Sequence, residues 1–353
     1  MDGFVTSLSA TIEDRAFPYW RPSSQPPLST GSPLARLALV VHHGAGRNAQ
    51  DYTSYMTNAA LRAGLSLDEV IVVGPQVFFT GDDGLDESAH IWWDTSSDDG
   101  LEDDSGERDW HWGGNSTVEL PASISTFSVL DEMFLTLGDK NLYPNLERAV
   151  LAGHSAGGQI TQRYALFSTV DALPIRYFVA NPSSVTWLDK RRPVQAATKE
   201  CNFCVNTTIL SQKWDFEVPE ASSSDCTATY DMYGYGLEGG LPDYLRATTV
   251  PRALEAYPAR DVVYLSGESD VCDSAFMGEE ECLECTPFDG GLDTSCEAEA
   301  QGWCRMARLH AFYQFVRLFY SNGTVHELVS VPGVGHSGCG MFQSDAFASA
   351  ALL

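Results

Sequence analysis

The chain has 353 residues, of which 44% are hydrophobic and 11% aromatic, which is enough to build one large hydrophobic core. Its 48 aspartate and glutamate residues outnumber its 21 lysine and arginine residues, so the formal net charge is −27. Such a charge argues against nucleic acid and anionic membrane surfaces as partners. No apolar stretch reaches the roughly 18 residues of a membrane span, so we expect none.

The cysteines and sequons of the chain bear on its compartment. Residues 1–14 have neither the basic start nor the apolar stretch of a signal peptide. All nine cysteines follow residue 200, and Asn-x-Ser/Thr sequons occur at Asn115, Asn206 and Asn322. Disulfides and glycans are typical of secreted proteins. We therefore expect a secreted, disulfide-bonded glycoprotein whose signal has been removed, with an intracellular location as the alternative.

The first 75 residues contain the start of a sheet. Residues 4–8 and 16–20 predict two short strands at an antiparallel edge. An apolar strand over 37–41 is followed by helical spacing of apolar residues over 52–63 and by a second apolar strand over 70–73. A strand, a helix and a strand at this spacing predict a βαβ unit, and hence a parallel sheet.

An acidic, tryptophan-containing loop follows over 82–115. Residues 82–109 hold twelve acidic residues and one arginine, interrupted by Trp92 and Trp93. Clustered charge of one sign predicts a solvated loop, with a calcium-binding loop as the alternative, although the spacing of an EF-hand is absent. Tryptophan rings in such a loop either lie buried beneath it or line a ligand pocket.

The rest of the chain continues the alternation of strands and helices. The apolar pattern predicts a helix at about 122–137, a strand at 149–152, a helix after Ser155, strands at 176–180 and 261–265, a helix at 300–320, a strand at 325–331 and a closing helix with Phe342, Phe347 and Leu352. Residues 185–258 show no clear parallel strand and many aromatic residues, which predicts an insertion over the sheet.

The sequence Gly153-His154-Ser155-Ala156-Gly157 has the pattern of a nucleophile elbow, a tight turn between a strand and a helix. The strand before it is apolar throughout, as a central parallel strand covered on both faces should be. The turn holds the serine in a strained backbone conformation, and glycines two residues before and after it avoid collisions with neighbouring chain. Ser155 is therefore the predicted nucleophile.

A serine nucleophile needs a base and an acid that orients the base. His336 follows the last predicted strand in a Gly-flanked turn, so we expect it to be the base; His154 we expect to point away from Ser155 as a packing residue. Asp270 follows the strand at 261–265 and is the predicted orienting acid, with Glu268 and Asp273 as competitors.

Ser155, Asp270 and His336 each follow a predicted parallel strand, and functional groups gather at the carboxyl ends of such strands. This order of serine, acid and histidine resembles the α/β-hydrolase-fold serine esterases of the broad esterase and lipase superfamily. The resemblance covers residues 35–353, with 185–258 as a variable cap. It implies an α/β fold with a mostly parallel central sheet, helices on both faces and a single catalytic domain over residues 1–353.

The resemblance also implies an oxyanion hole, two backbone N–H groups that stabilise the charge developing on a substrate oxygen. One would be the N–H of Ala156. The second should come from the loop at 42–46, with Ala45 the first choice and Gly44 and Gly46 the alternatives, because this loop lacks the three glycines common in some lipases.

Aromatic side chains suggest what the site binds. A cap of this size cannot bury all of its rings against itself, so we expect some to face the pocket and to favour neutral, moderately hydrophobic esters, in small molecules or polymers, over acetylated polysaccharides. The negative charge disfavours anionic substrates. The candidate substrate-binding residues are His43, Trp92, Trp93, Trp112 and Trp187.

The cysteine pairs raise a metal alternative. Cys201-x-x-Cys204 and Cys282-x-x-Cys285 together could supply four thiolates to zinc, but disulfides explain the cysteine count better. We expect neither a metal nor a cofactor.

Two other cysteines lie close to the predicted acid and base. Cys272 follows Asp270 by two residues and Cys339 follows His336 by three, so disulfides there would fix the two loops.

The leading hypothesis is a carboxylic ester hydrolase that forms an acyl-enzyme on Ser155. An amidase or peptidase with the same triad is one alternative, because the motif does not distinguish an ester from an amide. A catalytically silent member of the fold, acting as a binding module, is the other.

Overall fold

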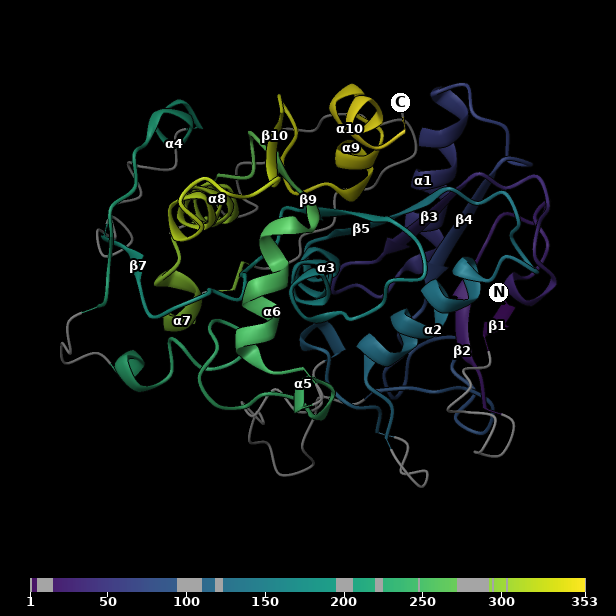
Figure 1. Cartoon of the computed structure of the whole chain (residues 1–353), viewed down its shortest axis with the longest axis horizontal. Helices are drawn as coiled ribbons and strands as arrows, with labels where there is room; N and C mark the ends of the chain where they lie inside the picture. The colour runs from purple at the N-terminus through teal and green to yellow at the C-terminus, as the bar shows by residue number, and fades with distance from the viewer. Residues whose placement is uncertain are drawn as a thin grey trace.

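A computed structural model describes residues 2–4, 15–93, 110–117, 123–194, 206–219, 225–246, 248–271, 292–293, 295–302 and 304–352. In this part of the chain, one eight-stranded sheet has the strand order β1-β2-β4-β3-β5-β6-β9-β10 (Figure 1). Its strands are β1 (Asp2–Phe4), β2 (Phe17–Trp20), β3 (Leu37–His42), β4 (Val70–Pro75), β5 (Arg148–His154), β6 (Ile175–Ala180), β9 (Asp261–Gly267) and β10 (Glu327–Val331).

The sheet is parallel except at the edge that holds the amino terminus. There β1 pairs antiparallel with β2, and β2 pairs antiparallel with β4. All pairs from β4 to β10 are parallel, and each needs a crossover connection between its strands. The predicted antiparallel edge and parallel centre are both confirmed.

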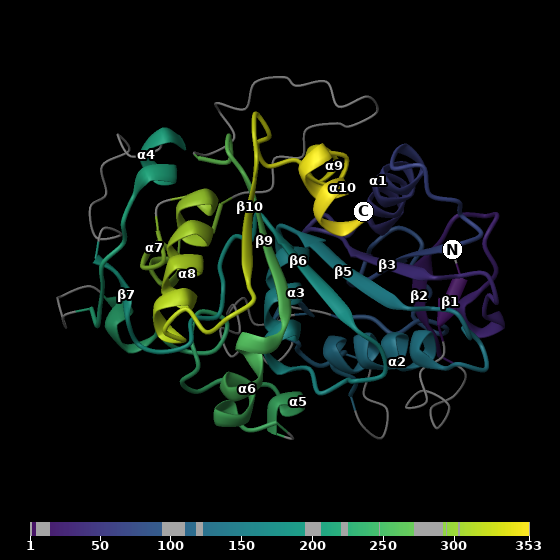
Figure 2. The same ribbon diagram turned by 45° about the horizontal axis from the view of Figure 1, so that its top comes forward.

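Helices cover both faces of the sheet (Figure 2). The α-helices in the described residues are α1 (Ala49–Arg62), α2 (Thr126–Gly138), α3 (Ala156–Phe167), α4 (Asn206–Ser211), α5 (Asp243–Arg246), α6 (Val250–Ala256), α7 (Cys296–Glu299), α8 (Arg305–Phe319), α9 (Gly338–Phe342) and α10 (Asp345–Ala351). Helices α1, α9 and α10 lie on one face, and α2, α3 and α6 lie on the other.

Strand β3 shows why its sequence is apolar throughout. Leu37, Leu39 and Val41 pack into the hydrophobic core beneath α1, α9 and α10, whereas Ala38 and Val40 pack into the core on the opposite face. Because successive side chains point to opposite faces of a sheet, a strand covered on both sides must be apolar at every position.

Three predicted helices have different bounds in the structure. Helix α2 begins at Thr126 rather than near residue 122, because the Ser125 hydroxyl accepts a hydrogen bond from the Phe127 N–H and caps it. The helix predicted over 300–320 begins at Arg305. The closing helix is two short helices, because Ser344 caps α10 by accepting a hydrogen bond from the N–H of Phe347.

The chain leaves the sheet after β6 and returns to it at β9. Between them it forms the antiparallel pair β7 (Arg192–Pro193) and β8 (Phe216–Glu217) and the helices α4, α5 and α6. Within this segment, Trp187 packs its ring 4.6 Å from that of Phe315 on α8. The role of residues 185–258 as a cap stays a prediction.

Candidate functional site

The turn at Ser155 has the backbone that the sequence predicted. Strand β5 ends at His154, helix α3 begins at Ala156, and Ser155 between them has a φ of 59° and a ψ of −123°. A Cβ atom added at Gly153 would lie 1.9 Å from the carbonyl oxygen of Gly157, and one added at Gly157 would lie 2.5 Å from that of His43. Both positions therefore require glycine if the turn is to keep this shape.

Ser155, His336 and Asp270 form one hydrogen-bonded chain. The Nε2 atom of His336 lies 3.0 Å from the Ser155 hydroxyl, and its Nδ1 atom lies 2.8 Å from Oδ2 of Asp270. An ionised Asp270 accepts the Nδ1 proton, which leaves Nε2 with a lone pair facing the serine. The arrangement can take a proton from the Ser155 hydroxyl and hold the resulting imidazolium beside a carboxylate.

A buried arginine lies beside the acid of this chain. The Nη1 atom of Arg305 is 3.6 Å from Oδ1 of Asp270, and only 4% and 2% of the two side chains are exposed. The Arg305 Nε–H donates to the Ser183 hydroxyl at 3.2 Å. Asp270 therefore faces the Arg305 guanidinium on one oxygen and His336 on the other.

The loop predicted to form the oxyanion hole borders the serine. Gly44, Ala45 and Gly46 line a small cavity of about 60 Å³ together with Ser155 and His336. Ala156 opens α3, where the first N–H groups of a helix have no acceptor within the helix. The loop at 44–46 and the start of α3 therefore both border Ser155.

An ion pair holds this loop in place. Arg47 donates to Asp82 from Nε and Nη2, both at 2.6 Å, and to the carbonyl oxygen of Ala45 at 3.1 Å. Although partial burial opposes ionisation, the hydrogen bonds from Arg47 hold the pKa of Asp82 below its ordinary value. At least one residue of the acidic loop therefore has a structural partner rather than only solvent.

His154 and Tyr52 line the same cavity, and the sequence assigned no site role to either. The Tyr52 hydroxyl lies 3.0 Å from Nδ1 of His154, and the His154 ring centre lies 4.5 Å from that of His336. Burial, and then the proximity of His336, lower the pKa of His154 well below its ordinary value. His154 thus packs as a neutral ring against the predicted base.

Comparisons with known proteins bear on the fold. Neither a protein-family model nor a curated protein matches the chain. Among solved structures, poly(aspartic acid) hydrolase-1 from Sphingomonas sp. KT-1 aligns with a TM-score of 0.52 at 20% identity, over 92% of this chain and 89% of that one. LpqC, a poly(3-hydroxybutyrate) depolymerase from Bordetella parapertussis, aligns with a TM-score of 0.50 at 19% identity, over 95% and 84%. The chain has the α/β-hydrolase fold.

Within this α/β-hydrolase fold, two predicted substrate contacts are wrong. Trp93 and Trp187 are both 0% exposed and belong to the main hydrophobic core. The Trp93 Nε1–H donates to the carbonyl oxygen of Gly114 at 3.0 Å, and Trp187 packs against α8. Rings enclosed in this way have no surface left for a substrate.

The other predicted substrate contacts also lie outside the lining of the cavity at Ser155. His43 is buried behind the oxyanion loop, where its Nδ1–H donates to Gly44 at 2.8 Å and its Nε2 accepts from the Val77 N–H at 3.1 Å. Burial lowers its pKa to about 4, so the ring supports the loop in its neutral form. Trp112 packs edge-on against Tyr235 at 5.7 Å, and Trp92 is partly exposed.

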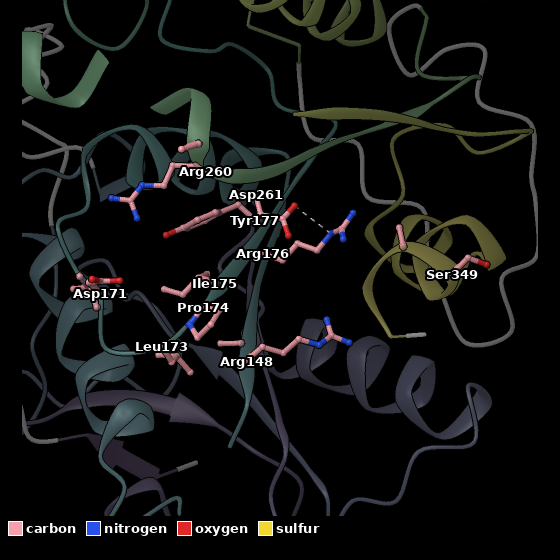
Figure 3. Close-up of a pocket in the computed structure, with 14 residues that line it drawn as sticks. Arg148, Asp171, Leu173, Pro174, Ile175, Arg176, Tyr177, Arg260, Asp261 and Ser349 are labelled. Atoms are coloured by element: carbon pink, nitrogen blue, oxygen red, sulfur yellow. Dashed lines mark ion pairs between the residues drawn. The ribbon is translucent and has the colours of Figure 1, made fainter. Parts of the chain in front are cut away.

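A larger cavity of about 620 Å³ lies at the amino ends of β5, β6 and β9, away from Ser155, which follows the carboxyl end of β5 (Figure 3). Its three arginines each have a partner: Arg148 donates to the carbonyl oxygen of Ala351, Arg176 to Glu327 and Arg260 to the carbonyl oxygen of Ser168. The residues that line it include no serine, histidine and acid in a hydrogen-bonded series. The hydrogen-bonded series of serine, histidine and acid described above borders the smaller cavity at Ser155.

The described cysteines favour disulfides over a metal site. In the described ranges, the side chains that lie close enough together to bind a metal ion are those of Cys226, Cys296 and Glu297. Cys226 and Cys296, however, form a disulfide bond with each other. The two Cys-x-x-Cys pairs and residues 94–109 of the acidic loop lie outside the described residues, so the zinc and calcium alternatives stay predictions.

No helix in the described part of the chain is long and apolar enough to cross a membrane.

Reduction of the disulfides under native conditions should lower activity before it unfolds the core. Cys339 is disulfide-bonded, follows His336 by three residues and lines the cavity at Ser155. Opening its disulfide frees the loop that carries the base. Ester hydrolysis and circular dichroism followed through a dithiothreitol titration measure both effects. Cys339→Ser should lose more activity than Cys226→Ser; equal losses, or a free Cys339 thiol by mass spectrometry, would contradict this prediction.

Proposed function

We propose that this protein is a serine hydrolase that cleaves carboxylic esters through an acyl-enzyme intermediate. The observation that carries the proposal is the hydrogen-bonded chain from Ser155 through His336 to Asp270, with distances of 3.0 and 2.8 Å. Support also comes from the strained turn at Ser155, since backbone strain of this kind collects at functional sites.

Acylation uses each of the three side chains. The Ser155 hydroxyl oxygen attacks the ester carbonyl carbon, and Nε2 of His336 takes the hydroxyl proton as the bond forms. Asp270 keeps the imidazole in the tautomer that accepts this proton and stabilises the imidazolium that results. The carbonyl oxygen becomes an oxyanion, and the N–H groups of Ala156 and of the loop at Gly44 and Ala45 stabilise it.

The two products leave in turn. His336 returns its proton to the leaving alcohol, and the acyl group stays on the Ser155 oxygen. A water molecule then attacks the acyl carbon, again losing a proton to His336, and the acid is released as Ser155 regains its hydrogen. The cycle needs no group from outside the chain apart from water.

The charge of the protein bears on the substrate. A net charge of −27 repels anions from the whole surface. We therefore assign neutral esters to the site, in small molecules or in polymers. A single α/β-hydrolase domain over residues 1–353 carries it.

The same proposal includes secretion. The disulfide between Cys226 and Cys296 supports an oxidising compartment, because such bonds are rare in reducing cytosol. The sequons at Asn115, Asn206 and Asn322 would then be available for glycosylation.

A matched pair of substrates tests the proposed function. The protein should hydrolyse a short-chain p-nitrophenyl ester faster than the anilide with the same acyl group, because p-nitrophenolate departs more easily than an aniline. A neutral ester should be preferred to one that carries a carboxylate. Values of kcat/KM across the set decide the matter. Faster turnover of the anilide would favour an amidase, and no turnover of either would favour a binding module.

A further inference from the structure

Asn181 has an unusual backbone and a buried polar side chain. It directly follows β6, which lies between the strand that ends at the nucleophile and the strand that leads to the acid (Figure 2). Its φ is +42° and it is 1% exposed. A residue other than glycine rarely adopts a positive φ, and asparagine is among the few that do so at modest cost. The position therefore accommodates some strain in order to place this side chain.

The side-chain amide of Asn181 joins the two loops that carry the acid and the base. Its Oδ1 accepts the N–H of Gly267 at 2.8 Å, and its Nδ2 donates to the carbonyl oxygen of Gly335 at 3.1 Å. Gly267 ends β9, three residues before Asp270, and Gly335 directly precedes His336. One rigid amide thus spans the backbone on both sides of the Asp270–His336 hydrogen bond.

The backbone around Asn181 extends this connection to the nucleophile. The N–H of Ser155 donates to the carbonyl oxygen of Ala180 at 3.0 Å, and the N–H of Asn181 donates to that of Leu265 at 3.1 Å. A Cβ atom added at Gly267 would lie 3.0 Å from the Asn181 Nδ2 and 2.5 Å from the carbonyl oxygen of Val334. The three loops of the site therefore meet at this residue with no spare room.

We propose that Asn181 is a positioning residue that sets the distance between Asp270 and His336, an inference that rests on the proposed hydrolase function. The role needs a donor and an acceptor on one short, neutral side chain. An ionised aspartate supplies only acceptors, and its carboxylate oxygen facing the Gly335 carbonyl oxygen would push the base loop away. Small misplacements of reacting groups, on the order of 1 Å, lower rates by about 100-fold.

Asn181→Gly removes the amide and keeps a residue that tolerates the positive φ. We expect kcat for a p-nitrophenyl ester to fall by about 10- to 100-fold, with KM changed by less than about threefold. Asn181→Asp keeps the shape and the acceptor for Gly267 but loses the donor to Gly335, so its kcat should fall at least as far. If Asn181→Gly fails to fold, Asn181→Asp still tests the proposal.

Asn322→Gly is the matched control. Asn322 also has a positive φ, of 62°, but lies in an exposed turn between α8 and β10. The wild type and all variants are deglycosylated before measurement, because Asn322 begins a sequon that Asn322→Gly removes. The control should keep wild-type kcat, and thermal unfolding of each variant separates a loss of positioning from a loss of stability.

The outcomes separate this inference from the proposed function. A wild-type protein that turns over no ester would overturn the proposed function. An active wild type together with an Asn181→Gly or Asn181→Asp variant within threefold of its kcat would overturn the role of Asn181 alone. A rise in KM with an unchanged kcat would do the same, since a positioning residue of the triad acts on the chemical step.

Discussion

Ser155→Ala should lower kcat for ester hydrolysis by about 10⁴- to 10⁶-fold while the protein stays folded. The substitution removes the oxygen atom that attacks the ester in the proposed mechanism. The Ser155 side chain makes its hydrogen bond to His336, and alanine fits the turn because it needs no more room than serine. Initial rates at saturating ester, together with a circular dichroism spectrum and a melting curve, measure the two parts of this expectation.

Ser266→Ala is the control for that experiment. Ser266 is fully buried and lies near the carboxyl end of β9, and its hydroxyl has no hydrogen-bond partner among the described residues. Its loss should change kcat by less than about threefold. A fluorophosphonate should label the wild type and Ser266→Ala but not Ser155→Ala. A fall in the activity of Ser155→Ala of less than about tenfold would remove Ser155 from the mechanism.

The turn at Ser155 could be predicted because the spacing of its glycines around the serine is a recognisable pattern. Only part of the reason for its shape lies within these five residues: a side chain at 153 would meet the backbone of Gly157, whereas one at 157 would meet that of His42 and His43 at the end of β3. The parallel sheet was equally accessible, because a strand such as β3 that is buried on both faces must be apolar at every position. Asp270 and His336 were predicted from their positions after the strands that form β9 and β10.

The aromatic residues could not be placed from the sequence, because their environment depends on distant parts of the chain. Trp187 is enclosed by Phe312 and Phe315, more than 120 residues later. A tryptophan in a loop-like sequence can line a pocket or belong to a core, and Trp93 and Trp187 belong to the core. The predicted starts of α2 and α10 were wrong because the hydroxyls of Ser125 and Ser344 cap these helices, and apolar periodicity does not reveal where a cap forms.

The residues that support the site were missed for the same reason. Asn181 acts on Gly267 and Gly335, which lie 86 and 154 residues away. Arg305 reaches Asp270 from the start of α8, in a helix that shows only an amphipathic pattern in the sequence. Periodicity reveals which face of an element is buried, but not which polar side chains a fold brings together.

Besides His336, five histidines are buried in the described part of the chain, each no more than 5% exposed. Burial lowers the pKa of His43, His310 and His326 from the ordinary value of 6.5 to about 4. It also lowers the pKa of His42 and His154 well below that value. The folded protein therefore holds all five as neutral rings over a pH range in which an unfolded chain would protonate them.

We expect the free energy of unfolding to fall steeply between pH 6.5 and pH 4. The stabilisation is complete above pH 6.5 and is lost as the pH falls, because the unfolded chain binds protons that the folded protein excludes. Each histidine whose pKa is lowered to about 4 accounts for about 3 kcal/mol over the whole range. Burial raises the pKa of Asp131 to about 6 and raises the pKa values of Asp231 and Asp261 above their ordinary value, and these shifts act with the opposite sign.

Urea unfolding at a series of pH values measures this slope, and His310→Leu provides the matched variant. The Nε2 atom of His310 has no hydrogen-bond partner among the described residues, and desolvation is the cause of its lowered pKa. Leucine of similar volume removes the titrating group without breaking a bond. The variant should lose about 1.4 kcal/mol per pH unit from the slope, whatever its stability at pH 8. A buried ring that resists protonation in the folded protein must make unfolding easier in acid. Two results would therefore show that the buried histidines do not control acid stability. One is a free energy of unfolding that stays constant between pH 6.5 and 5, and the other is a slope that His310→Leu leaves unchanged.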